Sequence, residues 1–99
     1  MQNDSQLPVT MWLRDFENGD DEAAQNLWDF YYHQIKATAD RRADNLPPGI
    51  IDGEDIAASV FESLWRGANN GRFREVASRD ELWYLLLALT KQKIANHVR

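Results

Sequence analysis

The residues best suited to chemistry are basic and amide side chains near the end of the chain. Lys91, Lys93, Asn96 and Arg99 lie close together in what the sequence predicts to be one helix. Lysine and arginine can contact phosphates, and an asparagine amide can read a base edge. This pattern indicates nucleic-acid binding. The alternative is that these charges only form a cationic helix end, which interacts favourably with the helix dipole. The sequence supports the two interpretations equally.

Two aromatic residues begin the same predicted helix, Trp83 and Tyr84. If exposed, such rings stack on single-stranded bases at about 1–3 kcal/mol per base. Trp83 lies within an apolar run, which favours a position at least half-buried in the core. Tyr84 fits either environment.

The sequence contains little that would support an enzymatic function. The sequence has no Gly-rich phosphate loop, no His-Glu-x-x-His motif and no cysteine. His33 and His97 lie far apart, and Glu54 and Asp55 are adjacent, so their carboxylates point to different sides of a helix. We therefore expect a protein that is not an enzyme and has no cofactor or metal.

Charge is distributed unevenly along the 99 residues, whose net charge is −5. Residues 1–65 carry 13 acidic and 4 basic side chains, whereas residues 66–99 carry 3 acidic and 7 basic ones. The basic part could meet phosphate while the acidic part meets a basic protein surface; a solvated surface of uneven charge is the alternative. The absence of cysteine, of a signal peptide and of a long apolar run predicts a soluble, cytoplasmic protein without membrane contact.

Hydrophobic spacing of about 3.6 residues predicts an all-α domain of four helices, a short one followed by three longer ones. The expected helices cover about 11–17 (capped by Thr10), 20 or 21 to about 42–44, 53–69 and 79–98, with Asp52 and Ser78 as further N-caps. Residues 1–8 are predicted to be a flexible N-terminus and residues 9–99 a single domain. The first half of the last helix is apolar nearly all round, which predicts a central position.

The third helix organises the chain because it carries two distinct stripes. Its predicted buried stripe consists of Ile56, Val60, Phe61, Leu64 and Trp65. A second, polar stripe falls at i, i+4, i+7 and i+11 and consists of Asp55, Ser59, Glu62 and Arg66. The polar stripe is free to meet water or a partner.

The order of these parts resembles region 2 of bacterial sigma factors of the extracytoplasmic-function (ECF) type. The similarity lies in Glu-Asp-Ile-x-x-x-Val-Phe-x-x-Leu-Trp-Arg at 54–66, the following connector and Arg-Asp-Glu-Leu-Trp at 79–83. Val-Thr-x-Trp-Leu-Arg-Asp at 9–15 and Gly-Asp-Asp-Glu-Ala-Ala-Gln-x-Leu-Trp at 19–28 are similar as well. The resemblance covers about residues 9–99.

This resemblance implies a transcription initiation domain that docks on the β′ clamp helices of RNA polymerase and recognises and melts the promoter −10 element. The polymerase-binding surface then maps onto Asp55, Ser59, Glu62 and Arg66. DNA contacts map onto Arg72, Arg74, Lys91, Lys93, Asn96 and Arg99, with Trp83 or Tyr84 as base-stacking groups. An anti-sigma factor is a further candidate partner.

The sequence departs from the family pattern in three places. Ala58 and Ser59 replace a Gln-Glu pair in the docking helix, Gln92 and Asn96 replace an Asn and Asp in the last helix, and the chain ends at Arg99 without the domain that reads the −35 element. A truncated or degenerate single-domain member is therefore expected. The alternative function is a sigma-like interaction or regulatory module that does not bind DNA; a helical carboxylate enzyme would need inward-facing acids that these helix faces do not supply.

Overall fold

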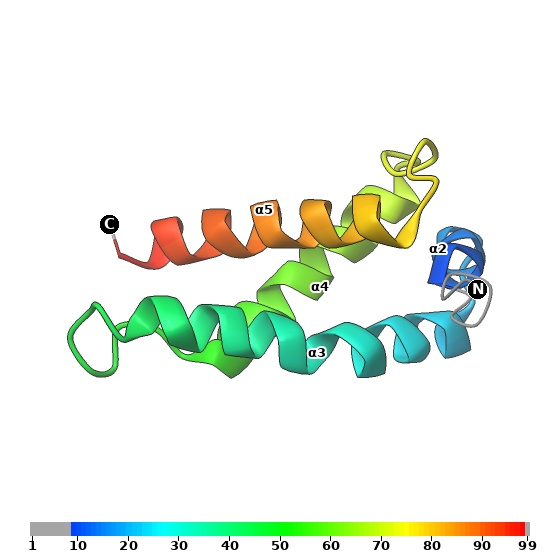
Figure 1. The fold of residues 1–99 in the computed structure, drawn as a ribbon. Helices are drawn as coiled ribbons and strands as arrows, with labels where there is room; N and C mark the ends of the chain where they lie inside the picture. Colours follow the sequence, from blue (N-terminus) through cyan, green and yellow to red (C-terminus); the bar gives the residue numbers. More distant parts are fainter. Residues whose placement is uncertain (1–8, 99) are drawn as a thin grey trace.

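The structure is a computed structural model that describes residues 9–98 as four helices joined by short connections (Figure 1). The helices are α2 (Val9–Glu17), α3 (Asp21–Ala43), α4 (Gly53–Asn69) and α5 (Arg79–His97). The described residues contain no strand, which confirms the predicted all-α class. None of these helices is long and apolar enough to cross a membrane. The predicted flexible segment 1–8 and Arg99 lie outside the described residues.

Two of the three predicted N-caps, Asp52 and Ser78, are observed, and Asp20 caps α3 in the same way. The Asp20 carboxylate accepts hydrogen bonds from the backbone N–H of Glu22 and Ala23, and Asp52 accepts one from the N–H of Glu54 at 2.9 Å. The Ser78 hydroxyl accepts from the N–H of Glu81 at 3.1 Å. Each side chain satisfies a donor that the first helical turn leaves unpaired.

The predicted start of the first helix was wrong. Helix α2 begins at Val9, two residues before the expected Met11, so Thr10 lies inside the helix and does not cap it. Val9 is fully buried and forms part of the core, and this burial stabilises a helical turn that the cap pattern did not reveal. The helix ends as expected at Asn18-Gly19, where Gly19 has a positive φ of 91°.

Helices α3 and α4 form the centre of the fold. Each of them packs against all three other helices, whereas α5 packs mainly on α3 and α4. In Figure 1, α3 and α5 run in the same direction and α4 crosses between them. The largest fully buried side chains come from all four helices and are Val9, Leu13, Leu27, Tyr31, Ile35, Ile56, Val60, Leu64, Leu82, Leu86 and Thr90.

The buried face of α4 is narrower than the predicted apolar stripe. Ile56, Val60 and Leu64 are fully buried as expected, but Phe61 is only half-buried and Trp65 is 55% exposed. At about 100° per residue, Trp65 lies about 180° from Ile56 around the helix. The core instead closes over small residues on the near side of α4, including Gly53, Ala57, Gly67 and Ala68.

The prediction of a central position for α5 was wrong. Only Leu82, Leu86, Thr90 and Ile94 are buried, a single row at i, i+4, i+8 and i+12. Leu85, Leu87 and Leu89 are half-buried and Ala88 is exposed. The Thr90 hydroxyl is accommodated in this row because it donates to the carbonyl of Leu86 at 2.7 Å. Helix α5 therefore covers the core from one side and leaves its outer face to solvent.

The connector between α4 and α5, residues 70–78, folds back on the end of α4. Phe73 is buried, and a Cβ added to Gly67 would lie 2.4 Å from its ring. Gly71, with a φ of 72°, makes the turn that returns the chain toward α4. Close packing of Phe73 on Gly67 thus sets the position of the connector.

We expect Gly67→Ala to lower the free energy of unfolding by about 1 kcal/mol in urea denaturation. Alanine is favoured over glycine in a helix by about 1 kcal/mol, but overpacking the Phe73 contact costs about 1–3 kcal/mol. In a Phe73→Leu background the ring is gone and the same change should stabilise. Stabilisation by Gly67→Ala in the native background would contradict the contact.

Candidate functional site

The predicted polar face of α4 is present on the surface. Asp55, Glu62 and Arg66 are exposed, and Ser59 is half-buried. Arg66 donates to the Glu62 carboxylate at 3.0 Å, and their side chains remain 74% and 59% exposed. A pair this exposed contributes little to folding stability, so both groups can exchange partners at low free-energy cost. We name Asp55, Ser59, Glu62 and Arg66 the α4 polar face.

The residues predicted to bind DNA fall into two groups at opposite ends of α5. Arg72 and Arg74 are exposed on the connector that precedes the helix, whereas Lys91 and Asn96 are exposed near its C-terminal end. Helical rise places Lys91 about 18 Å along α5 from its first residue, Arg79. The structure therefore does not gather these side chains into one patch.

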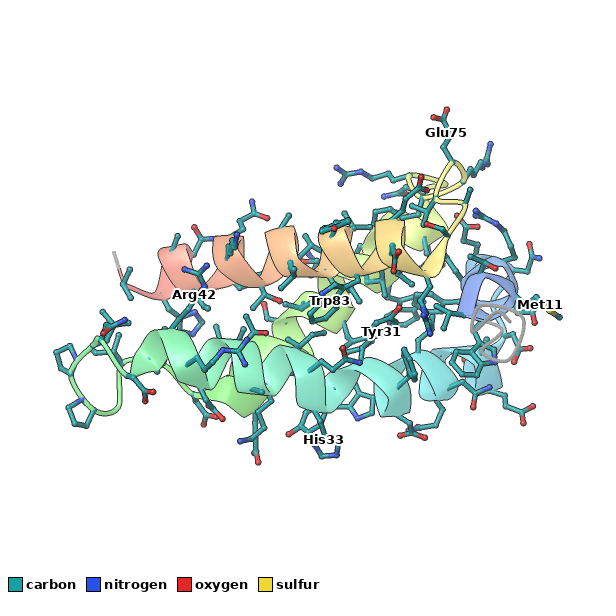
Figure 2. The ribbon with its side chains drawn as sticks, in the orientation of Figure 1. Met11, Tyr31, His33, Arg42, Glu75 and Trp83 are labelled. Atoms are coloured by element: carbon teal, nitrogen blue, oxygen red, sulfur yellow. The ribbon has the colours of Figure 1, made fainter. Side chains whose placement is uncertain are left out.

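The predicted DNA-binding residues near the C-terminal end of α5 are not equally accessible. Lys93 is half-buried, whereas Lys91 is exposed, and Arg99 lies outside the described residues. Helix α3 ends at the same end of the molecule, and Figure 2 shows Arg42 between the C-terminal ends of α3 and α5. Arg42 was not among the residues predicted to bind DNA, and it is exposed on the last turn of α3.

The two aromatic candidates occupy different environments. Tyr84 is 69% exposed. Trp83 is half-buried and stacks on Tyr31 of α3, with ring centroids 5.9 Å apart and an interplanar angle of 6°. Figure 2 shows Tyr31 and Trp83 in the space between the two helices. Tyr84 is thus free to stack on a base, whereas Trp83 already has a ring partner in the protein.

The connector that carries Arg72 and Arg74 is held by Arg14 of α2. Its guanidinium donates to the backbone carbonyls of Phe73, at 3.0 Å, and Val76. The same group pairs with the Glu17 carboxylate at 2.6 Å. This contact could not be predicted from the sequence, since Arg14 and Val76 are 62 residues apart and a charged residue on a short helix is ordinarily a surface residue.

A buried hydroxyl lies next to the Trp83 stack. Tyr31 is 2% exposed, and its hydroxyl has no hydrogen-bond partner among the described residues. Burial raises the pKa of Tyr31 to about 12, opposed by the nearby charge of Arg79 and assisted by that of Asp80. The neutral phenol is therefore the form that the folded protein requires.

A groove between α3 and α4 was missed by sequence reasoning. It has a volume of about 520 Å³, and its aromatic lining comes from Trp28, Phe61 and Trp65. Phe61 and Trp65 were predicted to belong to the buried stripe of α4. The angular positions of the residues around α4 could have indicated the groove. At about 100° per residue, Phe61 and then Trp65 lie progressively farther around the helix from the buried Ile56.

A family model described as ECF sigma factor matches residues 6–99 of the chain. The match spans nearly the whole sequence, and the helical fold agrees with it, so the chain belongs to the ECF sigma factor family. Comparisons with curated proteins and with solved structures gave no significant match.

Family membership defines the protein's general role. It is a sigma-factor domain that functions in transcription initiation and belongs to a non-enzymatic family. The family implies RNA polymerase core and promoter DNA as partners, and sigma factors as a class work in the cytoplasm.

Tyr31→Phe tests the buried hydroxyl through the pH dependence of stability. Tyrosine ionises near pH 10 when unfolded, and the folded pKa is about 12. The contribution of the neutral phenol is thus complete below pH 10 and is lost as the pH rises toward 12. Urea denaturation at pH 8 and pH 11 should show a larger loss of stability for the native chain than for Tyr31→Phe.

At pH 7 the Tyr31→Phe variant should unfold within about 1 kcal/mol of the native chain, because no hydrogen bond is removed. Absorbance titration at 295 nm provides the control, since the chain has three tyrosines. All three ionising together near pH 10 in the folded protein would contradict the burial argument.

Proposed function

We propose that this domain docks on the β′ clamp helices of RNA polymerase through the α4 polar face. The observation that carries the proposal is an exposed face of α4 with polar and charged groups in a chain of the ECF sigma factor family. Its packing on α2, α3 and α5 makes α4 a rigid support for that face. A rigid surface loses little conformational freedom on binding.

The composition of the face determines what kind of surface it can meet. Asp55 and Glu62 supply its negative charge, and Arg66 is balanced by Glu62. Where family members carry a Gln-Glu pair, this chain has an exposed Ala58 and a half-buried Ser59. Docking therefore depends on fewer polar groups here, with a basic clamp surface opposite Asp55 and Glu62.

The proposal extends to the promoter −10 element, which the domain recognises and whose melted strand it holds. Arg72 and Arg74 contact phosphates from the connector, Lys91 and Lys93 do so from α5, and Asn96 is placed to read a base edge. The exposed ring of the set, Tyr84, stacks on an unpaired base. Two basic groups at the two ends of α5 fit a strand that runs along this helix.

The negative charge of the domain makes polymerase essential to this function. At a net charge of −5, the isolated chain repels DNA as a whole, although both basic groups attract phosphate locally. Docking of the acidic α4 face on a basic clamp would neutralise part of that charge. The domain then reaches DNA because polymerase delivers it.

Charge reversal of the ion pair tests docking. Glu62→Lys combined with Arg66→Glu keeps an i,i+4 pair on α4 and the net charge of the chain, so the fold should be retained. Calorimetric titration with an isolated β′ clamp-helix fragment should show binding at least about tenfold weaker than for the native domain. The loss should shrink as salt is raised.

A matched control reverses another exposed ion pair. Lys36 and Asp40 of α3 also form an i,i+4 pair, at 2.9 Å, and Lys36→Glu with Asp40→Lys should bind the fragment like the native domain. Absence of binding by the native domain itself would overturn the docking proposal and favour a degenerate module.

Lys91→Ala tests the nucleic-acid contact. With polymerase core and a single-stranded oligonucleotide of mixed sequence, we expect weaker binding and a decrease of about 1 in the salt slope, because one phosphate contact is lost. Fluorescence anisotropy at several salt concentrations measures both quantities. Lys91→Arg should restore them. Unchanged affinity and slope for Lys91→Ala would favour the interaction module that does not bind DNA.

A further inference from the structure

The groove between α3 and α4 is an apolar surface to which the docking proposed for the α4 polar face assigns no role. Trp28 and Phe61 line it and are in ring contact, with centroids 4.8 Å apart. Trp65 stands at its edge and is 55% exposed. A tryptophan held open beside a groove is unusual for a monomeric surface, because burying it would remove a large apolar area from water.

The groove and the α4 polar face are continuous. Besides Phe61, the residues of α4 that line the groove lie at i, i+4, i+7 and i+11, namely Ala58, Glu62, Trp65 and Asn69. Glu62 belongs to both surfaces, so the two faces lie side by side on the helix. A partner that covers Asp55, Glu62 and Arg66 therefore has the groove within reach without a second docking step.

The rim of the groove selects the charge of its occupant. The charged residues among its lining are both acidic, Asp21 and Glu62, and the remaining polar ones are Gln25 and Asn69. No arginine or lysine lines it within the described residues. An apolar side chain flanked by basic residues would complement the groove twice, because its apolar part meets the aromatic lining and the basic residues meet the acidic side chains.

We infer that the groove receives an apolar side chain from the same β′ clamp helix that meets the α4 polar face, with Trp65 as its principal contact. The inference rests on the proposed docking and adds a second, apolar component to it. Buried tryptophan contacts at the centre of an interface commonly carry much of its affinity. This component offsets the reduced number of polar groups at positions 58 and 59.

The two components differ in their response to salt, which allows them to be separated. Charge contacts on an exposed face are screened as ionic strength rises. Apolar burial is not screened, and it gives binding a negative heat-capacity change. Titration of the clamp-helix fragment at ~0.05 M and ~0.3 M salt, and at several temperatures, reports both.

Trp65→Ala is the main variant. We expect it to weaken binding of the clamp-helix fragment about thirtyfold, the size of a typical hot-spot truncation. The loss should be the same at both salt concentrations, and the heat-capacity change should become less negative. Trp65→Phe should retain most of the affinity. Met11→Ala, which truncates a side chain that is 63% exposed on α2, is the control and should bind normally.

The outcomes distinguish failure of the groove inference from failure of the docking proposal. If charge reversal at Glu62 and Arg66 weakens binding but Trp65→Ala does not, the groove inference is overturned and the docking proposal stands. If the native domain does not bind the fragment, both are overturned. Sedimentation of the free domain supplies the remaining test, because self-association abolished by Trp65→Ala would make the groove a contact between copies of this chain and overturn the inference. Thermal melting should show that every variant remains folded at the temperature of the titrations.

Discussion

The fold depends on the small width of the face that α4 buries in the core. Its core-facing side combines branched residues such as Ile56 and Val60 with small ones such as Gly53, Ala57 and Gly67. Small residues let neighbouring elements approach closely, as the Phe73 ring does at Gly67. The core is thus closed over roughly a third of the helix circumference, since the buried positions span about 120°.

Because the buried face of α4 is narrow, most of the helix surface stays exposed even though α4 packs against three other helices. In a chain of 99 residues, a wider buried face would stabilise the domain but leave fewer side chains at the surface. The remaining two thirds of α4 hold the charged pair, the acidic N-terminal turn and Trp65. Stability comes from one side of the helix, and the proposed docking surface lies on the others.

Much of the secondary structure could be predicted from the sequence because it depends on local rules. The Asp20, Asp52 and Ser78 caps act within three residues of themselves, and Gly19 ends α2 through a backbone conformation that glycine favours. The fold class followed from spacing alone. The polar face of α4 was also predictable, because it depends on one helix.

Features that depend on packing between helices could not be predicted in this way. The incomplete burial of α5 follows from how it packs on α3 and α4. Arg14 finds its acceptors 59 and 62 residues away. Hydropathy treated Trp65 as core because it records the side chain and not the direction in which it points.

The contact of Arg14 with the connector has a consequence for how such a domain can diversify. Its acceptors there are main-chain carbonyls, of Phe73 and Val76, which every amino acid supplies. The exposed positions 72, 74, 75 and 77 can therefore be substituted without removing the anchor. A loop whose backbone is fixed independently of its surface residues can acquire new sequence preferences through single substitutions, while its shape is inherited unchanged.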